Sequence, residues 1–178
     1  MELDPALTMG LSLGLAALFA AGAIHKLRTP RAFFAIVRNY RLAPAAPAAG
    51  SAVIAAETTI AVGLVIPAWR QDAALGAAAL LGIYGIAIAI NIMRGRTAID
   101  CGCSFGARGD RLTWWLPLRN AVLALSALAL TLPAASRALG WLDALTIGLF
   151  VAGAAVLYAT FEALRSNTAR QARTRRPL

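Results

Sequence analysis

Residues 73–93 read AALGAAALLGIYGIAIAINIM, an apolar run without a single charged side chain. An α-helix needs about 20 such residues to cross the hydrocarbon core of a bilayer. The runs Ala6–Ile24 and Ala144–Phe161 are also free of charged residues. These three runs predict membrane-spanning helices and not the core of a water-soluble domain.

Two further apolar runs contain one ionisable residue each. Ala48–Trp69 includes Glu57, and Leu116–Ser136 includes Arg119 close to its start, where a long cationic side chain can reach the membrane interface. Across the chain 60% of the residues are hydrophobic and only 14% are charged, which leaves too little polar surface for a soluble domain. We therefore expect five membrane spans.

The resulting fold prediction is all-α, a polytopic membrane protein with a four-helix core plus one further helix. Residues 1–165 are expected to form the bundle and residues 166–178 a basic tail without a fold. The first span is predicted to stay in place, because Glu2 and Asp4 stand where a cleavable signal peptide carries basic residues.

The net charge of +9 is concentrated at the ends of the apolar runs and is not interleaved with stacking aromatic residues. This pattern argues against a nucleic-acid partner and favours a role in membrane orientation. Most of the basic residues follow the first, third and fifth runs. The positive-inside rule then predicts that the N-terminus lies outside and that the C-terminus lies in the cytoplasm.

Between Pro30 and Pro44 the sequence RAFFAIVRNYRLA places Phe33, Val37 and Tyr40 at helical spacing. Three arginines alternate with these apolar residues. The pattern predicts a short amphipathic helix at the membrane interface, packed on the bundle.

The chain has two cysteines, Cys101 and Cys103, separated by Gly102 on the polar loop 94–114. Thiols this close can form a small, strained disulfide, and strained or exposed disulfides are the labile, catalytic ones. Neighbouring arginines favour the reactive thiolate, whereas Asp100 raises a thiol pKa or accepts its proton. Inert thiols in a reducing cytosol are the alternative. No metal is predicted, because His25 is the one histidine in addition to the two cysteines, and zinc would also require carboxylates, water or a second subunit.

Glu57 lies near the middle of a span, where an ionisable group is costly and therefore a functional candidate. Its candidate partners are His25 and Lys26 at the end of the first span, or Arg119 with Asn120 at the start of the fourth. A structural, hydrogen-bonded Glu57 and a role in proton handling are both open at this point.

The chain resembles the MauE methylamine-utilisation membrane proteins, which are related to the broader DoxX-like group. The resemblance covers about two-thirds of the chain, from the first span to the middle of the fourth. It is carried by Lys26, Pro30 and Phe33, Glu57 and Gly63, Arg94-Gly-Arg, Asp100-Cys-Gly-Cys and Arg119-Asn120. After Cys103 the sequence departs from the family pattern, because Ser104 and Phe105 precede Gly106.

The resemblance implies a membrane protein that supports disulfide formation or thiol transfer in the periplasm beside a MauD-like, thioredoxin-fold partner. Its implied client is methylamine dehydrogenase. Cys101 and Cys103 would carry the exchange, with Asp100, Glu57, Lys26 and Arg119 in support. A membrane quinone is a candidate electron carrier by analogy alone, and no other cofactor is expected.

The predicted orientation places the cysteine loop on the cytoplasmic side, away from a periplasmic client. Either reducing equivalents pass through the bundle, or the charge rule assigns the wrong orientation. Two other function classes also stay open. One is a non-catalytic assembly factor that anchors a thioredoxin-like partner. The other is a transporter with a polar pathway through Glu57, Asn91 and Arg119.

Overall fold

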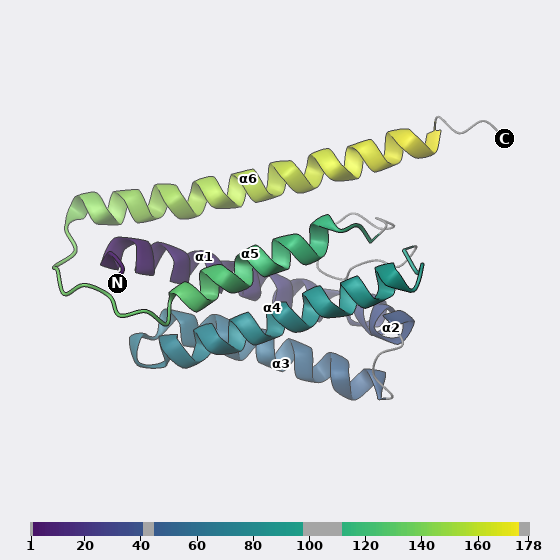
Figure 1. Ribbon diagram of the computed structural model, residues 1–178, viewed down its shortest axis with the longest axis horizontal. Helices are drawn as coiled ribbons and strands as arrows, with labels where there is room; N and C mark the ends of the chain where they lie inside the picture. Colours follow the sequence, from purple (N-terminus) through teal and green to yellow (C-terminus); the bar gives the residue numbers. More distant parts are fainter. Residues whose placement is uncertain (1, 41–44, 98–111, 175–178) are drawn as a thin grey trace.

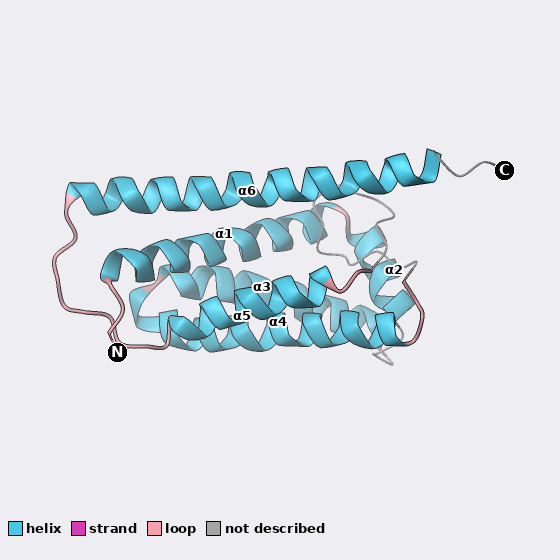
Figure 2. Cartoon of the chain, turned by 45° about the horizontal axis from the view of Figure 1, so that its top comes forward, coloured by secondary structure: helices cyan, strands magenta, loops and turns pink. Residues whose placement is uncertain are grey.

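The computed structural model describes residues 2–40, 45–97 and 112–174. Every named element in this part is a helix, and one isolated bridge pairs Leu3 with Ala134 (Figure 2). The elements are α1 (Pro5–Arg28), α2 (Pro30–Tyr40), α3 (Ala46–Val65), the 3-10 turn η1 (Pro67–Trp69), α4 (Arg70–Met93), α5 (Trp115–Ala129) and α6 (Trp141–Thr174). The predicted all-α class is confirmed.

Within residues 2–40, 45–97 and 112–174, four helical segments are long and apolar enough to cross a membrane, namely Pro5–Arg28, Ala46–Val65, Pro67–Met93 and Trp141–Thr160. The fifth, α5, is apolar but has only 15 residues. At 1.5 Å per residue it is about 22 Å long, shorter than the roughly 30 Å hydrocarbon core. The protein is a multi-pass membrane protein, and its described residues include four helices of spanning length and one short apolar helix.

The predicted extent of the fourth span, Leu116–Ser136, is wrong at its C-terminal end, because α5 stops at Ala129. The chain tightens there: the N–H groups of Leu130, Thr131 and Leu132 each donate to the carbonyl three residues back. Pro133 follows, and proline lacks the N–H that a continuing helix needs and disfavours helical backbone in the residue before it. Apolar composition continues past this point, but the helix cannot.

Helices α1, α3, α4 and α5 form the core of the bundle, and α6 lies along its side against α1 (Figure 1). This is the predicted four-helix core plus one. The short α2 lies where α1 and α4 end and where α3 and α5 begin, and we call this the α2 end. Helix α6 continues to Thr174, into the basic segment that we expected to lack a fold.

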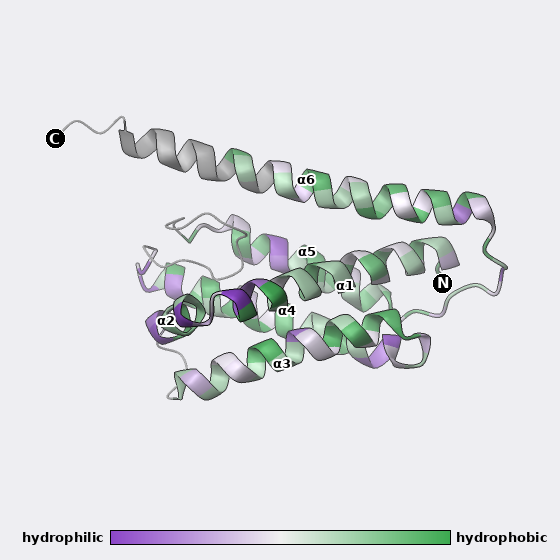
Figure 3. Cartoon of the chain, turned by 180° about the vertical axis from the view of Figure 1, so that it is seen from behind, coloured by the Kyte–Doolittle hydropathy of each residue, from purple (hydrophilic) through white to green (hydrophobic). Residues whose placement is uncertain are grey.

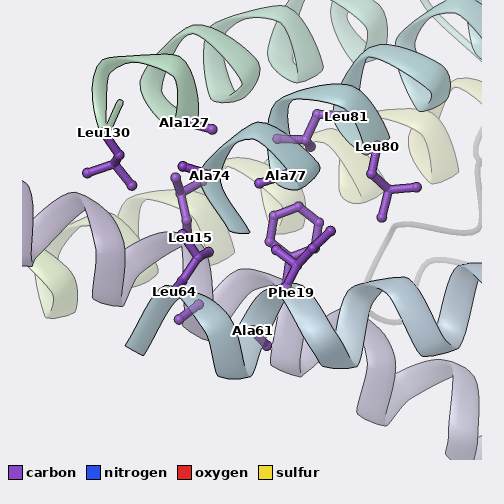
Figure 4. Packing of buried hydrophobic residues seen from close by; sticks show 12 residues of the cluster. Leu15, Phe19, Ala61, Leu64, Ala74, Ala77, Leu80, Leu81, Ala127 and Leu130 are labelled. Carbon is purple, nitrogen blue, oxygen red and sulfur yellow. The ribbon is translucent and has the colours of Figure 1, made fainter. Parts of the chain in front are cut away.

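Small residues allow the core helices to approach closely. The largest buried cluster joins Leu15 and Phe19 of α1 to Leu64 of α3 and to alanines and leucines of α4 and α5 (Figure 4). A Cβ added to Gly63 would lie only 2.8 Å from Cβ of Ala73, so α3 and α4 touch at this point. Close approach through small residues is the usual way in which membrane helices gain packing.

A network of charged residues closes the end of the bundle opposite α2. Asp4 caps α1, with its carboxylate accepting from Ala6 N at 2.8 Å. The Arg137 guanidinium donates to Asp4 at 3.0 Å and to Asp143 at the start of α6 at 2.7 Å. The hydrogen bond from Arg137 holds the pKa of Asp4 below its usual value. The network ties the N-terminus, the α5–α6 connection and α6 together.

The amphipathic character predicted for residues 30–44 is confirmed for α2. Phe33 is buried against the bundle, while Arg31 and Arg38 are exposed. Hydrophilic colours gather at the two ends of the bundle, and hydrophobic colours run along the helices between them (Figure 3). The apolar sides of the helices are therefore left for lipid.

Candidate functional site

The two ends of the polar loop meet at the α2 end of the bundle. Gly95, with a φ of 71°, turns the chain out of α4 in a conformation that favours glycine. Leu112 N then donates to Thr97 O at 2.9 Å. Leu112 is buried in a small cluster with Ile88 and Leu116. The segment between Thr97 and Leu112 therefore begins and ends at one fixed point.

Asp100, Cys101 and Cys103 fall within residues 98–111 and lie outside the described residues. Their predicted role is not tested by the geometry. The other predicted site residues, Lys26, Glu57 and Arg119, are all described.

Lys26 and Glu57 form a buried ion pair between α1 and α3. The Lys26 ammonium lies 2.7 Å from Oε1 and 2.8 Å from Oε2 of Glu57. Both side chains are only 4% exposed. Of the candidate partners for Glu57, Lys26 is the one that it contacts. The lysine stem is long enough for its head group to reach inward from the last turn of α1 to mid-bundle.

Two aromatic residues complete the surroundings of this pair. The Tyr84 hydroxyl of α4 donates to Glu57 Oε1 at 2.7 Å. The Lys26 ammonium lies 5.5 Å from the centre of the Phe33 ring and 5.9 Å from that of Tyr84. A buried charge pair is tolerated when further hydrogen bonds and ring faces replace lost water. Residues of four helices thus meet at the pair.

A second polar cluster lies beside the first. Arg119 of α5 donates from Nη1 to the Tyr158 hydroxyl of α6 at 3.0 Å, and its guanidinium lies 5.6 Å from the centre of that ring. The neighbouring Asn120 is only 2% exposed. Its Nδ2 group has no hydrogen-bond partner among the described residues.

One cavity of about 40 Å³ connects the two clusters. Its polar lining residues are Lys26, Glu57, Tyr84, Arg119, Asn120 and Tyr158, and its other walls are Leu18, Phe19, Gly22, Leu81 and Leu123. Two cationic side chains and one anionic side chain line it, so its formal charge is positive. The structure thus brings three predicted site residues together around one space.

Sequence reasoning missed Tyr84 and Tyr158. The available signal was a phenol in the middle of an apolar run, because a buried tyrosine hydroxyl usually has a hydrogen-bond partner. Asn91, named for a polar pathway, is fully buried, donates to Ala87 O of its own helix at 2.9 Å and does not line this cavity. Among the described residues, no three His, Cys, Asp or Glu side chains are grouped to hold a metal ion.

The family model described as methylamine utilisation protein MauE matches residues 4–133. The chain belongs to the MauE family. It is 42% identical over 137 residues to a methylamine utilization protein MauE of Paracoccus denitrificans, covering 75% of this chain and 74% of that relative. With a MauE protein of Methylorubrum extorquens it shares 44% identity over 158 residues, covering 86% and 84% of the two chains. No solved structure matches the chain.

The MauE match begins at Asp4 and ends at Pro133. It therefore spans Lys26, Glu57, Arg119 and the cysteine loop, and it excludes α6. The chain is therefore a multi-pass membrane member of a family that is involved in methylamine utilisation.

Proposed function

We propose that this MauE-family protein performs thiol–disulfide exchange at the membrane through Cys101 and Cys103. The exchange would support disulfide formation or cofactor maturation of a periplasmic protein such as methylamine dehydrogenase. One observation carries the proposal. The chain's two cysteines flank a single glycine on a segment whose ends are joined by the Leu112 to Thr97 hydrogen bond.

The exchange is balanced between two cysteine pairs. A cysteine of one pair loses its proton, and the resulting thiolate attacks the disulfide of the other pair. A mixed disulfide forms, and one sulfur leaves as a thiolate, which takes up a proton. The remaining thiol of the attacking pair then resolves the mixed disulfide. Two electrons and two protons pass from one pair to the other, and no further oxidant is consumed. The partner is a thioredoxin-fold protein with its own cysteine pair.

The electrostatics of the α2 end support a reactive thiolate. Arg94 and Arg96 follow α4 directly, and Arg28, Arg31 and Arg38 lie on or beside α2 at the same end. Positive charge near a thiol lowers its pKa and raises the thiolate fraction at neutral pH. The same charges favour a cytoplasmic α2 end in the bacterial inner membrane, with the N-terminus outside and the C-terminus inside. In this orientation the exchange serves a periplasmic client through reducing equivalents that pass through the bundle. If the α2 end faces outside instead, the cysteine pair meets its partner in the periplasm directly.

The test replaces Cys101, Cys103 or both by Ser in cells that depend on the protein for methylamine dehydrogenase maturation. Each single variant should abolish maturation while the protein stays in the membrane at its normal level. One single variant should also trap a mixed disulfide with the thioredoxin-fold partner, visible on a non-reducing gel. Ser104→Ala, a change beside the pair that removes no thiol, is the matched control.

If the variant lacking both cysteines supports maturation at the normal level, thiol exchange is wrong. The protein would then act as a non-catalytic anchor or assembly factor for its partner.

A further inference from the structure

The cavity between the two polar clusters is sized for water. In liquid water each molecule occupies about 30 Å³, and a dry engineered cavity that accepts benzene measures roughly 150 Å³. At about 40 Å³ the cavity is large enough for water and much smaller than that benzene-binding cavity.

The polar groups around the cavity match the needs of water. An internal water is held by two to four hydrogen-bonding partners. Asn120 Nδ2 is buried and lacks a protein acceptor among the described residues. A buried donor without an acceptor is destabilising, because it has lost its hydrogen bonds to water. A water held here would accept from Asn120 Nδ2 and would donate to the Glu57 carboxylate, which lines the same space.

We propose that this cavity holds ordered water in contact with the Lys26–Glu57 pair and makes the pair an internal proton-exchange site. A proton that leaves the Lys26 ammonium for a water oxygen is replaced by one from the same water, so no net charge moves. The site uses none of the residues of the cysteine loop. It therefore stands independently of the proposed thiol exchange.

Gly22 keeps the space open beside the ion pair. A Cβ built on Gly22 would lie 3.5 Å from both carboxylate oxygens of Glu57 and 3.5 Å from Lys26 Nζ. These are ordinary van der Waals distances, so Gly22→Ala introduces a methyl group without a clash. The methyl group occupies space in the cavity wall and removes water from the pair. Gly14, on the same helix α1, has no atom of a described residue within 4 Å of its built Cβ, so Gly14→Ala is the matched control.

Lys26 is the sole lysine in the sequence, so ¹⁵N-lysine labelling gives one Nζ signal. In solid-state NMR of the protein in liposomes, the experiment measures how fast magnetisation passes from water protons to this Nζ signal, which is the build-up rate of the signal. The wild type and Gly14→Ala should show fast build-up. Gly22→Ala should slow it about threefold or more, because the methyl group displaces water that contacts the ammonium. The Nζ chemical shift verifies that the ion pair persists in each variant.

Two results would overturn the proposal. In the first, the wild-type Nζ signal builds up as slowly as buried backbone amides of the bundle, which means that the pair is dry. In the second, Gly22→Ala builds up as fast as Gly14→Ala, which means that the water reaches Lys26 by another route. Neither result bears on the cysteine exchange.

Discussion

Replacing Lys26 by Met removes the cation from the buried pair and leaves Glu57 inside the bundle. At 2.7 Å and an effective dielectric constant of about 20, the gross attraction within the pair is about 6 kcal/mol. Removing the two ions from water costs several kcal/mol for each ion, and this cost offsets most of the attraction. Removing one partner keeps the desolvation cost of the other, so Lys26→Met should lower the free energy of unfolding by about 3–5 kcal/mol.

The double variant Lys26→Met/Glu57→Gln separates this effect from simple loss of packing. It has no buried charge at this position, and the amide oxygen of the introduced glutamine can still accept the hydrogen bond from Tyr84. Its unfolding free energy should therefore lie closer to the wild type than that of Lys26→Met alone. The free energy of unfolding of all three proteins is measured by steric trapping in bicelles.

Arg28→Met is the matched control, because it removes an exposed cation from the same helix. It should change the unfolding free energy by no more than about 0.5 kcal/mol. If Lys26→Met behaves like Arg28→Met, or if the double variant is no closer to the wild type than Lys26→Met, the buried pair is not coupled as described.

Three other parts of the molecule give predictions of their own. Gly63→Ala should destabilise the protein by about 1–3 kcal/mol in the same unfolding assay, since its methyl group would meet Ala73 Cβ at 2.8 Å; an unchanged value would contradict the α3–α4 contact. The pKa of Asp4 is lowered in the folded state, so its ion pair with Arg137 should hold above the usual Asp pKa and weaken as pH falls through the lower folded value; NMR titration of the Asp4 carboxyl checks this, and an unshifted midpoint contradicts it. A cysteine placed at Ser104 in a Cys101→Ser/Cys103→Ser background should resist an impermeant thiol reagent in intact cells, and labelling from outside would reverse the proposed orientation.

Residue pattern alone was sufficient for the class of fold. Uncharged runs of membrane-spanning length predict helices because a bilayer leaves few alternatives for the backbone. The end of α5 was missed because the apolar run continues through Leu130 and Leu132, beyond the last residue of the helix. Pro133 ends the helix, and the hydrogen bonds of the turn before it already join residues three apart, as in a 3-10 helix.

The polar site was predictable in its members but not in its arrangement. Glu57 stood out because charge is rare inside a span, and its partner was one of a few nearby cations. Choosing Lys26 over Arg119 required the depth of each side chain, which depends on helix packing and on the reach of the lysine stem. The contribution of Tyr158 could not be predicted, because it depends on α6 lying beside α1 and presenting its phenol to α5.

Thiol exchange by Cys101 and Cys103 is the central claim, and trapping their redox state in living cells tests it most directly. Cells are quenched with acid, free thiols are modified with a mass-adding maleimide, and the protein is resolved on a non-reducing gel. We expect both unmodified and doubly modified wild-type protein to be present, and we expect deletion of the thioredoxin-fold partner to move the population to one of these two forms. A pair that is fully modified in every strain, with no change when the partner is absent, would contradict it.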